Sequence, residues 1–431
     1  MSDDGPQLVV RPEELASIDD SPSRMAGIPG SRMFEIKEAL AVFRRDNPDR
    51  EMFDASQGDG GASLPGVPVE LLEEAHRLQI EHGTGYDKPF GTPEFRTAVV
   101  EDYWQLDAAT GWGPENVLAG VGGRDVLVKA YDAAQFLGHD RRGDFVAVSR
   151  VPWISYNWGP YAIGGNVMLA PGREDDAWAL TPGSIRAMVD AAAGYGGRKI
   201  SMLVITSPDN PTGRSLSPER QIELARAAFA AKIPFVLFDW IYHRVTDEEP
   251  HDLNAFLLSL EPEERDRCIF LDGITKNLGA SNIRNAHLVS SKEMTAFMQS
   301  RASHAVIPSF HSQAVAIAAY RKGFAEAAAP IVEPTNASRR VMQSFIEEKG
   351  LRSILGKGYY AFLDVGPWID RADLSDGAEL GAILAERFGL AVVPGIYFSD
   401  FGARWIRFSY ALPPEVSRAA TNRLWEGLSS L

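Results

Sequence analysis

The sequence predicts an α/β protein with a mostly parallel sheet that is covered by helices on both faces. In the middle of the chain, short apolar runs alternate with segments of helical spacing. Continuous apolar runs are typical of strands buried on both faces, and their alternation with helices is typical of parallel sheets. The expected strands are residues 145–148, 166–170, 201–206, 234–239, 268–272 and 286–290, with helices near 183–193 and 217–232.

The first third of the chain is expected to start with an arm and then to form helices. Residues 1–30 are rich in Pro, Gly, Ser and Asp, a composition typical of a loosely ordered extension. Residues 116–121 indicate a strand, and Gly122 and Gly123 separate it from a following helix. Helical spacing of apolar residues predicts the earlier helices at 33–45, 68–82 and 93–106.

The last third of the chain predicts a second, smaller α+β domain, to which the N-terminal segment is expected to return. Strands are expected at 359–364 and 405–410, with a helix near 377–388 between them. The predicted organisation is an N-terminal arm (1–32), the N-terminal part of the small domain (33–75), a large domain (76–315) and the C-terminal part of the small domain (316–431).

Composition and charge argue against several classes of protein. Of the 431 residues, 45% are apolar and 23% are charged, which is ordinary for a globular protein, and the net charge of −15 disfavours a nucleic-acid partner. The single cysteine, Cys268, cannot form a disulfide framework. We expect no membrane span and no signal peptide, because no apolar run is long enough and the N-terminus is acidic. A cytoplasmic protein is therefore expected.

Lys276 is the residue around which the predicted chemistry is arranged. It lies between the apolar runs 268–272 and 286–290, so we expect it on a polar loop between two strands. A lysine that is partly desolvated and close to other cations has a lowered pKa and can form a Schiff base with a carbonyl. Taken alone, a lysine between strands is usually a solvated surface charge, and only the other motifs of the chain favour the catalytic interpretation.

Other polar residues fall at or just after the ends of predicted strands. Asp239 ends one strand and Asn210 follows another. Ligands of parallel sheets bind at the carboxyl ends of strands, so we expect both side chains to lie near Lys276. Gly122 and Gly123 stand before a helix, where free N–H groups and positive potential suit a phosphate. A plain tight turn is the alternative for these two glycines.

Taken in chain order, these motifs resemble the fold type I pyridoxal-phosphate enzymes, and most closely the class I and II branch of aspartate-aminotransferase type. The resemblance extends over residues 33–425. It implies a seven-stranded type of sheet between helices, a smaller α+β domain, and pyridoxal 5′-phosphate as the cofactor. The motifs are Ser207-Pro-Asp-Asn-Pro-Thr-Gly213, Asp239-Trp-Ile-Tyr242, Thr275-Lys276 with Arg284, and Ile406-Arg407-Phe-Ser-Tyr-Ala411.

The resemblance implies roles for the residues that would hold the cofactor ring. Lys276 would form the Schiff base, and its amine, once displaced by substrate, would move a proton from the substrate Cα. Asp239 would pair with the pyridinium nitrogen. Tyr242 and Asn210 would hydrogen-bond the phenolic oxygen and so lower the pKa of the Schiff base.

The resemblance also implies a phosphate site and a shared active site. Gly273 replaces the usual serine three residues before the lysine, so one phosphate contact is expected to be absent. Tyr86 matches a tyrosine that reaches the phosphate bound by the neighbouring subunit, which implies a homodimer. The implied phosphate ligands within the chain are Gly122, Gly123, Arg124, Thr275 and Arg284.

Substrate contacts are implied at four positions. Trp153 would stack on the cofactor ring, although a tryptophan in an apolar run can also be a core residue. Arg407 would bind the substrate α-carboxylate, and this substrate would be the partner that a buried arginine needs. Gly58 would lie near the same carboxylate, and Asn210 and Trp153 would also contact the substrate. No metal is expected.

The predicted function is a pyridoxal-phosphate-dependent aminotransferase that moves the amino group of an α-amino acid to a 2-oxo acid through Lys276. A lyase, cyclase, decarboxylase or oxidase of an amino acid remains open, because these reactions share the fold and the first steps. No second arginine for a dicarboxylate is evident, so aspartate is not predicted as the donor. A ligand-sensing transcription regulator would need a DNA-binding module, for which the acidic residues before the core are too few.

Overall fold

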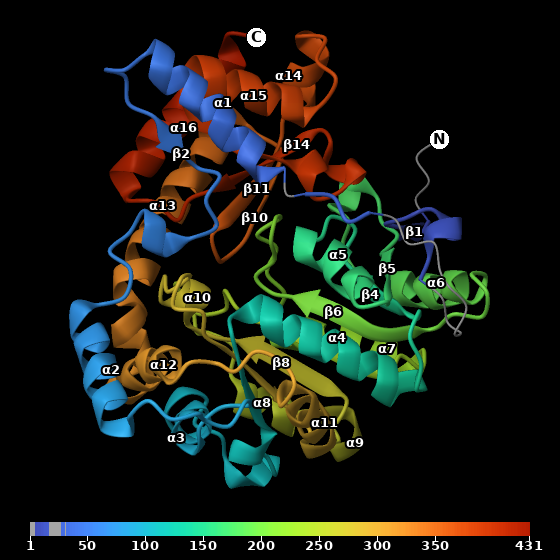
Figure 1. Cartoon of the computed structure of the whole chain (residues 1–431). Helices are drawn as coiled ribbons and strands as arrows, with labels where there is room; N and C mark the ends of the chain where they lie inside the picture. Colours follow the sequence, from blue (N-terminus) through green and yellow to red (C-terminus); the bar gives the residue numbers. More distant parts are fainter. Residues whose placement is uncertain (1–4, 17–26, 31) are drawn as a thin grey trace.

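A large sheet forms the centre of the protein, seen in the lower part of Figure 1. The computed structural model describes residues 5–16, 27–30 and 32–431. Four neighbouring strand pairs in this sheet are parallel, which confirms the predicted α/β class. The order of its eight strands is β1 (Gln7–Leu8), β5 (Asn166–Leu169), β4 (Phe145–Val148), β6 (Ile200–Thr206), β7 (Phe235–Asp239), β8 (Cys268–Asp272), β9 (Ala286–Ser290) and β3 (Val117–Gly120).

Each face of this sheet packs against its own layer of helices. Successive side chains of a strand point to opposite faces, so Leu237 joins one apolar core while Val236 and Phe238 join the other. The first core includes side chains of α4 (Gly123–His139), α5 (Ile154–Ala162) and α11 (Lys292–Ala302). The second includes side chains of α2 (Val69–His82), α3 (Pro93–Ala98), α6 (Pro182–Ala193), α7 (Pro218–Ala230), α8 (Leu253–Leu258) and α12 (Phe310–Lys322).

The eighth strand, β1, comes from the segment expected to be an arm. It pairs antiparallel with β5, with Leu8 opposite Met168, whereas the resemblance implied seven strands. Leu15 and Ala16 are buried, and Leu15 joins the core that contains Val236 and Phe238. The Ala16 N–H donates a hydrogen bond to Asn166 Oδ1 at 2.9 Å. The prediction of an arm was based on the polar composition of residues 1–30 as a whole, and it did not take account of single apolar residues such as Leu8 and Leu15.

The smaller part of the protein combines N-terminal and C-terminal elements, and Figure 1 shows the blue α1 beside α15. Strand β2 (Phe53–Asp54) pairs with β12 (Leu390–Ala391), so the N-terminal segment returns as expected. The antiparallel sheet has the order β10 (Ser353–Leu355), β11 (Tyr360–Asp364), β14 (Trp405–Ser409) and β13 (Val393–Pro394). The helices are α1 (Met33–Asp46), α13 (Phe324–Lys349), α14 (Gly366–Arg371), α15 (Gly377–Phe388) and α16 (Pro414–Ser429).

The predicted domain boundaries fall inside helices. Residue 75 lies in α2 and residue 315 in α12, and these two helices pack against each other. The division at these two positions therefore stays a prediction. Two short helices, α9 (Pro262–Arg265) and α10 (Ile274–Asn277), complete the set. Among the described residues, every helix is too short or too polar to cross a membrane.

Candidate active site

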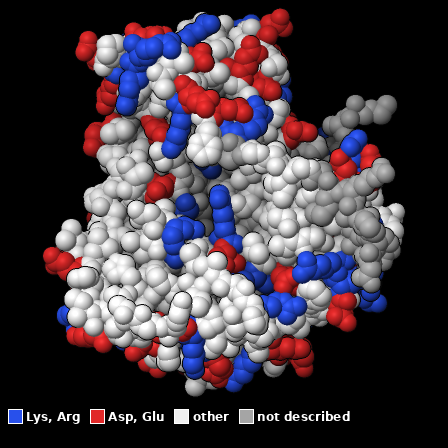
Figure 2. Space-filling view, in the orientation of Figure 1, with Lys and Arg blue, Asp and Glu red and all other residues white. Residues whose placement is uncertain are grey.

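A cavity of about 520 Å³ lies at the carboxyl ends of β6, β7 and β8. Figure 2 shows Lys and Arg side chains gathered at the recess between the upper and lower parts of the molecule. Tyr360 on β11 contributes from the smaller part. The cavity is lined by Gly123, Arg124, Leu127, Trp153, Tyr156, Thr206, Asn210, Asp239, Ile241, Tyr242, Leu271, Thr275, Lys276, Ser281, Arg284 and Tyr360.

Lys276 lies in this cavity, but on the short helix α10 and not on the predicted loop. Its Nζ donates a hydrogen bond to the Gly58 carbonyl. Burial, together with the nearby guanidinium groups of Arg407, Arg124 and Arg284, lowers the pKa of Lys276 to about 8, although Asp59 opposes the shift. The neutral fraction of this amine at neutral pH is therefore far larger than that of a lysine with the ordinary pKa, although the protonated form still predominates.

Asp239 faces the cavity from the end of β7. Its Oδ2 accepts a hydrogen bond of 2.6 Å from the Tyr156 hydroxyl, and its Oδ1 accepts one of 3.1 Å from the Ile241 N–H. The Tyr156 hydroxyl in turn accepts a bond of 3.0 Å from Thr206 Oγ1. Burial raises the pKa of Asp239 to about 6. Tyr156 and Thr206 were absent from the sequence-based site, although Tyr156 lies three residues beyond Trp153 on the adjoining helical turn.

Tyr242, Tyr360 and Asn210 form one wall with Arg407 behind them. The hydroxyl groups of Tyr242 and Tyr360 are 3.0 Å apart. The Arg407 guanidinium lies 4.3 Å from the centre of the Tyr360 ring and donates to Asn210 Oδ1 at 2.8 Å. It also donates to the carbonyl of Ser56 at 2.7 Å. Arg407 thus has protein partners, where the sequence led us to expect only a substrate.

The start of α4 and Arg284 form the basic end of the cavity. Gly122 has φ +80°, and a Cβ on it would lie only 2.3 Å from Arg284 Nη2, so a side chain does not fit there. Arg284 donates to the carbonyl groups of Ser281, at 2.7 Å, and Val121, at 3.3 Å. The Arg124 guanidinium lies 5.2 Å from the Trp153 ring centre, and burial together with Arg284 lowers the pKa of Arg124.

Three further predicted residues differ in how they relate to the cavity. Gly58 contacts the site through its carbonyl, and a Cβ on it would lie 2.4 Å from the Tyr360 hydroxyl. Thr275 lines the cavity and donates its hydroxyl to the Asn285 carbonyl at 3.3 Å. Tyr86 is 99% exposed and does not line the cavity.

The comparison with protein families decides the family of this chain. The family model for aminotransferases of class I and II matches residues 53–424. The chain belongs to the aminotransferase class I and II family. This membership confirms the predicted resemblance and the prediction that the chain is an aminotransferase.

Curated relatives of this aminotransferase cover most of its length. It is 26% identical to the aspartate/prephenate aminotransferase of Thermus thermophilus over 83% of this chain and 86% of the relative. It is 27% identical to the aspartate aminotransferase of Streptomyces avermitilis over 80% of this chain and 81% of the relative.

Solved structures share the fold of the aminotransferase. A double mutant of the Thermus thermophilus aspartate aminotransferase has a TM-score of 0.79 and 22% identity, covering 93% of this chain and 97% of the other. An aminotransferase from Mycobacterium tuberculosis has a TM-score of 0.79 and 21% identity, covering 96% and 100%.

Proposed function

We propose that this aminotransferase holds pyridoxal 5′-phosphate covalently through Lys276 and takes the amino group from an α-amino acid with a free carboxylate. The observation that carries the proposal is that Lys276 and Asp239 line the same cavity. Lys276 supplies an amine of lowered pKa, and Asp239 supplies a buried carboxylate. The bound cofactor supplies an electron sink for the electron pair released at the substrate Cα.

The described residues fit the polar groups of this cofactor. The N–H groups at the start of α4 and the guanidinium of Arg284 suit the phosphate, and the space that a Gly122 side chain would fill is needed by Arg284. The Asp239 carboxylate has two donors and keeps acceptor capacity for a protonated ring nitrogen. Gly123, Arg124, Thr275 and Trp153 line the same cavity and complete the proposed cofactor site.

The groups that would contact the phenolic oxygen are oriented by hydrogen bonds. Because Arg407 donates to Asn210 Oδ1, the Asn210 Nδ2 group is left to donate into the cavity. The Tyr242 hydroxyl is fixed by its contact with the Tyr360 hydroxyl. The Asn210 amide and the Tyr242 hydroxyl would together stabilise the anion of the phenolic oxygen, and both residues follow strands of the large sheet.

The substrate carboxylate is assigned to Arg407. A guanidinium has five N–H groups, and Asn210 and Ser56 use only two of them. Its Nε has no hydrogen-bond partner among the described residues, although it is buried. A buried guanidinium with free donors suits a carboxylate, while its two protein bonds hold it in place before substrate binds.

Lys276 is the proton-transfer group in this proposal. Burial and the nearby guanidinium groups lower the pKa of Lys276 to about 8, so its amine would be suited to accept the proton from the substrate Cα. Asp239 keeps negative charge beside the ring nitrogen while this proton moves. Both functions use only side chains that already face the cavity.

The proposed assembly is a homodimer with shared active sites. Tyr86 is 99% exposed, and two apolar side chains of the preceding helix α2, Val69 and Ile80, are 67% and 68% exposed. Such side chains gain stability when a second subunit covers them. Tyr86 would then reach the phosphate of the partner.

A half-reaction tests the function. The protein loaded with pyridoxal 5′-phosphate is mixed with single amino acids in the absence of a 2-oxo acid, and absorbance and products are followed. One equivalent of oxo acid, with the cofactor converted to its amine form, is the expected result. Release of ammonia with the cofactor unchanged would instead indicate a lyase or oxidase. The Lys276→Ala variant should neither bind the cofactor covalently nor turn over.

A further inference from the structure

The carboxylate of Asp272 lies behind the active site and receives four hydrogen bonds. Its Oδ1 accepts from the Gly273 N–H at 2.6 Å and from Asn277 Nδ2 at 3.0 Å. Its Oδ2 accepts from His243 Nε2 at 2.8 Å and from the Tyr103 hydroxyl. The Asp272 side chain is only 1% exposed. A buried carboxylate is costly unless its acceptor sites are filled, and here they are.

Asp272 does not face the cavity itself. Asp239 lies opposite Leu271 in the parallel pair of β7 and β8, and Leu271 lines the cavity. The next side chain along β8 points to the other face of the sheet, so Asp272 lies among Tyr103, His243 and their neighbours. It therefore acts on the site only through the backbone and side chains that it holds.

The four donors come from the two segments that carry the reactive groups, and from Tyr103. Gly273 and Asn277 flank Lys276 on α10, a helix of four residues that is too short to be stable by itself. His243 directly follows Tyr242 in the segment after Asp239. One carboxylate thus joins the Lys276 segment to the Asp239–Tyr242 segment.

The charge states of the pair are set by this geometry. His243 is fully buried, burial lowers its pKa, and its Nδ1 has no hydrogen-bond partner among the described residues. An ionised Asp272 can only accept, so His243 Nε2 is the donor in this pair. Burial favours the neutral acid of Asp272, but His243, with His287 and Tyr103, outweighs it and holds the pKa of Asp272 below its usual range. The Asp272 charge also adds to the burial that raises the pKa of Asp239.

We propose that the ionised Asp272 is a positioning residue that fixes the Lys276 helix against the Asp239–Tyr242 segment, with His243 as its partner. This role rests on the proposed function, because it concerns how Lys276 and Asp239 meet the cofactor. Misplacement of reacting groups by about 1 Å can cost about 100-fold in rate, so loss of this anchor should affect turnover although Asp272 touches no substrate.

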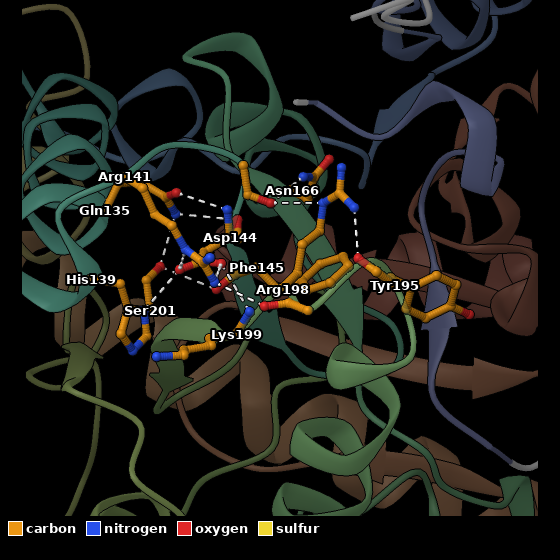
Figure 3. A network of polar contacts seen from close by, with 12 residues as sticks. Gln135, His139, Arg141, Asp144, Phe145, Asn166, Tyr195, Arg198, Lys199 and Ser201 are labelled. Carbon is orange, nitrogen blue, oxygen red and sulfur yellow. Dashed lines mark hydrogen bonds and ion pairs between the residues drawn. The ribbon is translucent and has the colours of Figure 1, made fainter. Parts of the chain in front are cut away.

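The protein offers a matched control in Asp144, which stands just before the start of β4, whereas Asp272 lies at the end of β8; Figure 3 shows Asp144 within its own polar network. Its side chain is also fully buried and pairs with a histidine, His139, at 2.8 Å. Further donors are Arg141, at 2.9 Å, and the Lys199 N–H, at 2.9 Å. Asp144→Asn therefore removes a comparable buried charge without touching the active site.

The experiment compares holoenzymes of the wild type, Asp272→Asn and Asp144→Asn. We measure kcat and KM, the pH titration of the absorbance of the Lys276-bound cofactor, and the unfolding midpoint. For Asp272→Asn we expect a fall in kcat of about tenfold or more and a displaced absorbance titration, for the reason of geometry given above. For Asp144→Asn we expect kcat and the absorbance titration to stay at wild-type values. The unfolding midpoint should fall in Asp272→Asn and in Asp144→Asn.

A second pair of variants keeps Asp272 in place. His243→Gln retains an N–H donor at about the reach of Nε2, whereas His243→Leu removes it. The proposal requires His243→Gln to stay near the wild-type titration and kcat, and His243→Leu to follow Asp272→Asn. This pair decides the question even if Asp272→Asn fails to fold.

Two results would overturn the inference, and they differ in scope. If Asp272→Asn and Asp144→Asn lose stability alike and neither moves kcat or the absorbance titration, Asp272 is only a structural residue and the proposed function stands. If wild-type protein carries the cofactor on another lysine, or takes up none, the proposed function falls and the inference falls with it.

Discussion

At Lys276, burial and three arginines oppose protonation of the amine. Its pKa falls from the usual 10.5 to about 8, while Asp59 limits the shift. A lysine of ordinary pKa would be almost wholly protonated at neutral pH and a poor nucleophile. The same residue would also be a poor proton acceptor. The environment of the side chain, rather than its identity, makes it suitable for chemistry.

The lowered pKa predicts how fast the apoprotein should take up pyridoxal 5′-phosphate at different pH values. Only the neutral amine reacts, so the rate of covalent attachment should rise about tenfold per pH unit below pH 8 and level off above it. Stopped-flow absorbance measures this rate, and Lys276→Ala is the control without a signal. A midpoint near 10.5 would contradict the account of the site given above.

At the scale of elements, the turn between β3 and α4 shows how backbone geometry builds the basic end of the site. Gly122 adopts φ +80° and leaves room for the Arg284 guanidinium, which bonds the carbonyl of Val121. The helix that follows has 17 residues, long enough to present a positive N-terminus. The basic end of the site therefore needs the glycine turn at Gly122, which leaves room for the Arg284 guanidinium next to the start of α4.

Gly122→Ala should weaken cofactor binding more than it weakens the fold. The added Cβ meets Arg284, and displacement of this ligand should raise the Kd for pyridoxal 5′-phosphate about tenfold or more, since 1.4 kcal/mol of lost interaction is tenfold. Gly111 has φ +73° with open space around it, so Gly111→Ala carries backbone strain of about 1–2 kcal/mol without the collision. Fluorescence titration of both apoproteins measures the difference. Equal Kd values for the two variants would refute the proposed phosphate site.

At the scale of the whole molecule, the N-terminal segment is fastened to the large sheet by side chains from distant parts of the chain. Asn166 bonds both the N–H and the carbonyl of Ala16, and Arg198 donates to the same carbonyl at 2.7 Å. Tyr161 donates its hydroxyl to the Glu14 carbonyl at 2.8 Å. These contacts extend the sheet by β1 at its β5 edge.

Asn166→Ala should therefore destabilise the protein by about 1–3 kcal/mol, because it leaves the buried N–H of Ala16 without its acceptor, while Arg198 still donates to the Ala16 carbonyl. Its cost should be smaller in a chain that lacks residues 1–16, since only the bond to the Gly143 carbonyl is then lost. Urea unfolding of the four proteins in this cycle measures the coupling. An equal cost in both backgrounds would mean that the Asn166 bonds to Ala16 contribute nothing to stability.

The sequence by itself determined the class of fold, the family and the residues at the ends of the strands. Apolar runs and the positions of Asp239, Asn210 and Lys276 depend on local pattern, and parallel strands necessarily bring their carboxyl ends to one edge. Only the tertiary structure revealed Tyr156, Tyr360 and the Ser56 carbonyl, because their partners lie tens to hundreds of residues away.

Long-range contacts also decided the local conformation at three places where the sequence misled us. Lys276 lies on a helix because the distant Tyr359 hydroxyl donates a hydrogen bond to the Lys276 carbonyl and holds this turn in place. Residues 7–8 form a strand because β5 has a free edge for them. Arg407 has protein partners because Asn210 and Ser56 approach it from other elements. In each case the stabilising atom is distant in sequence, and local composition carries no information about it.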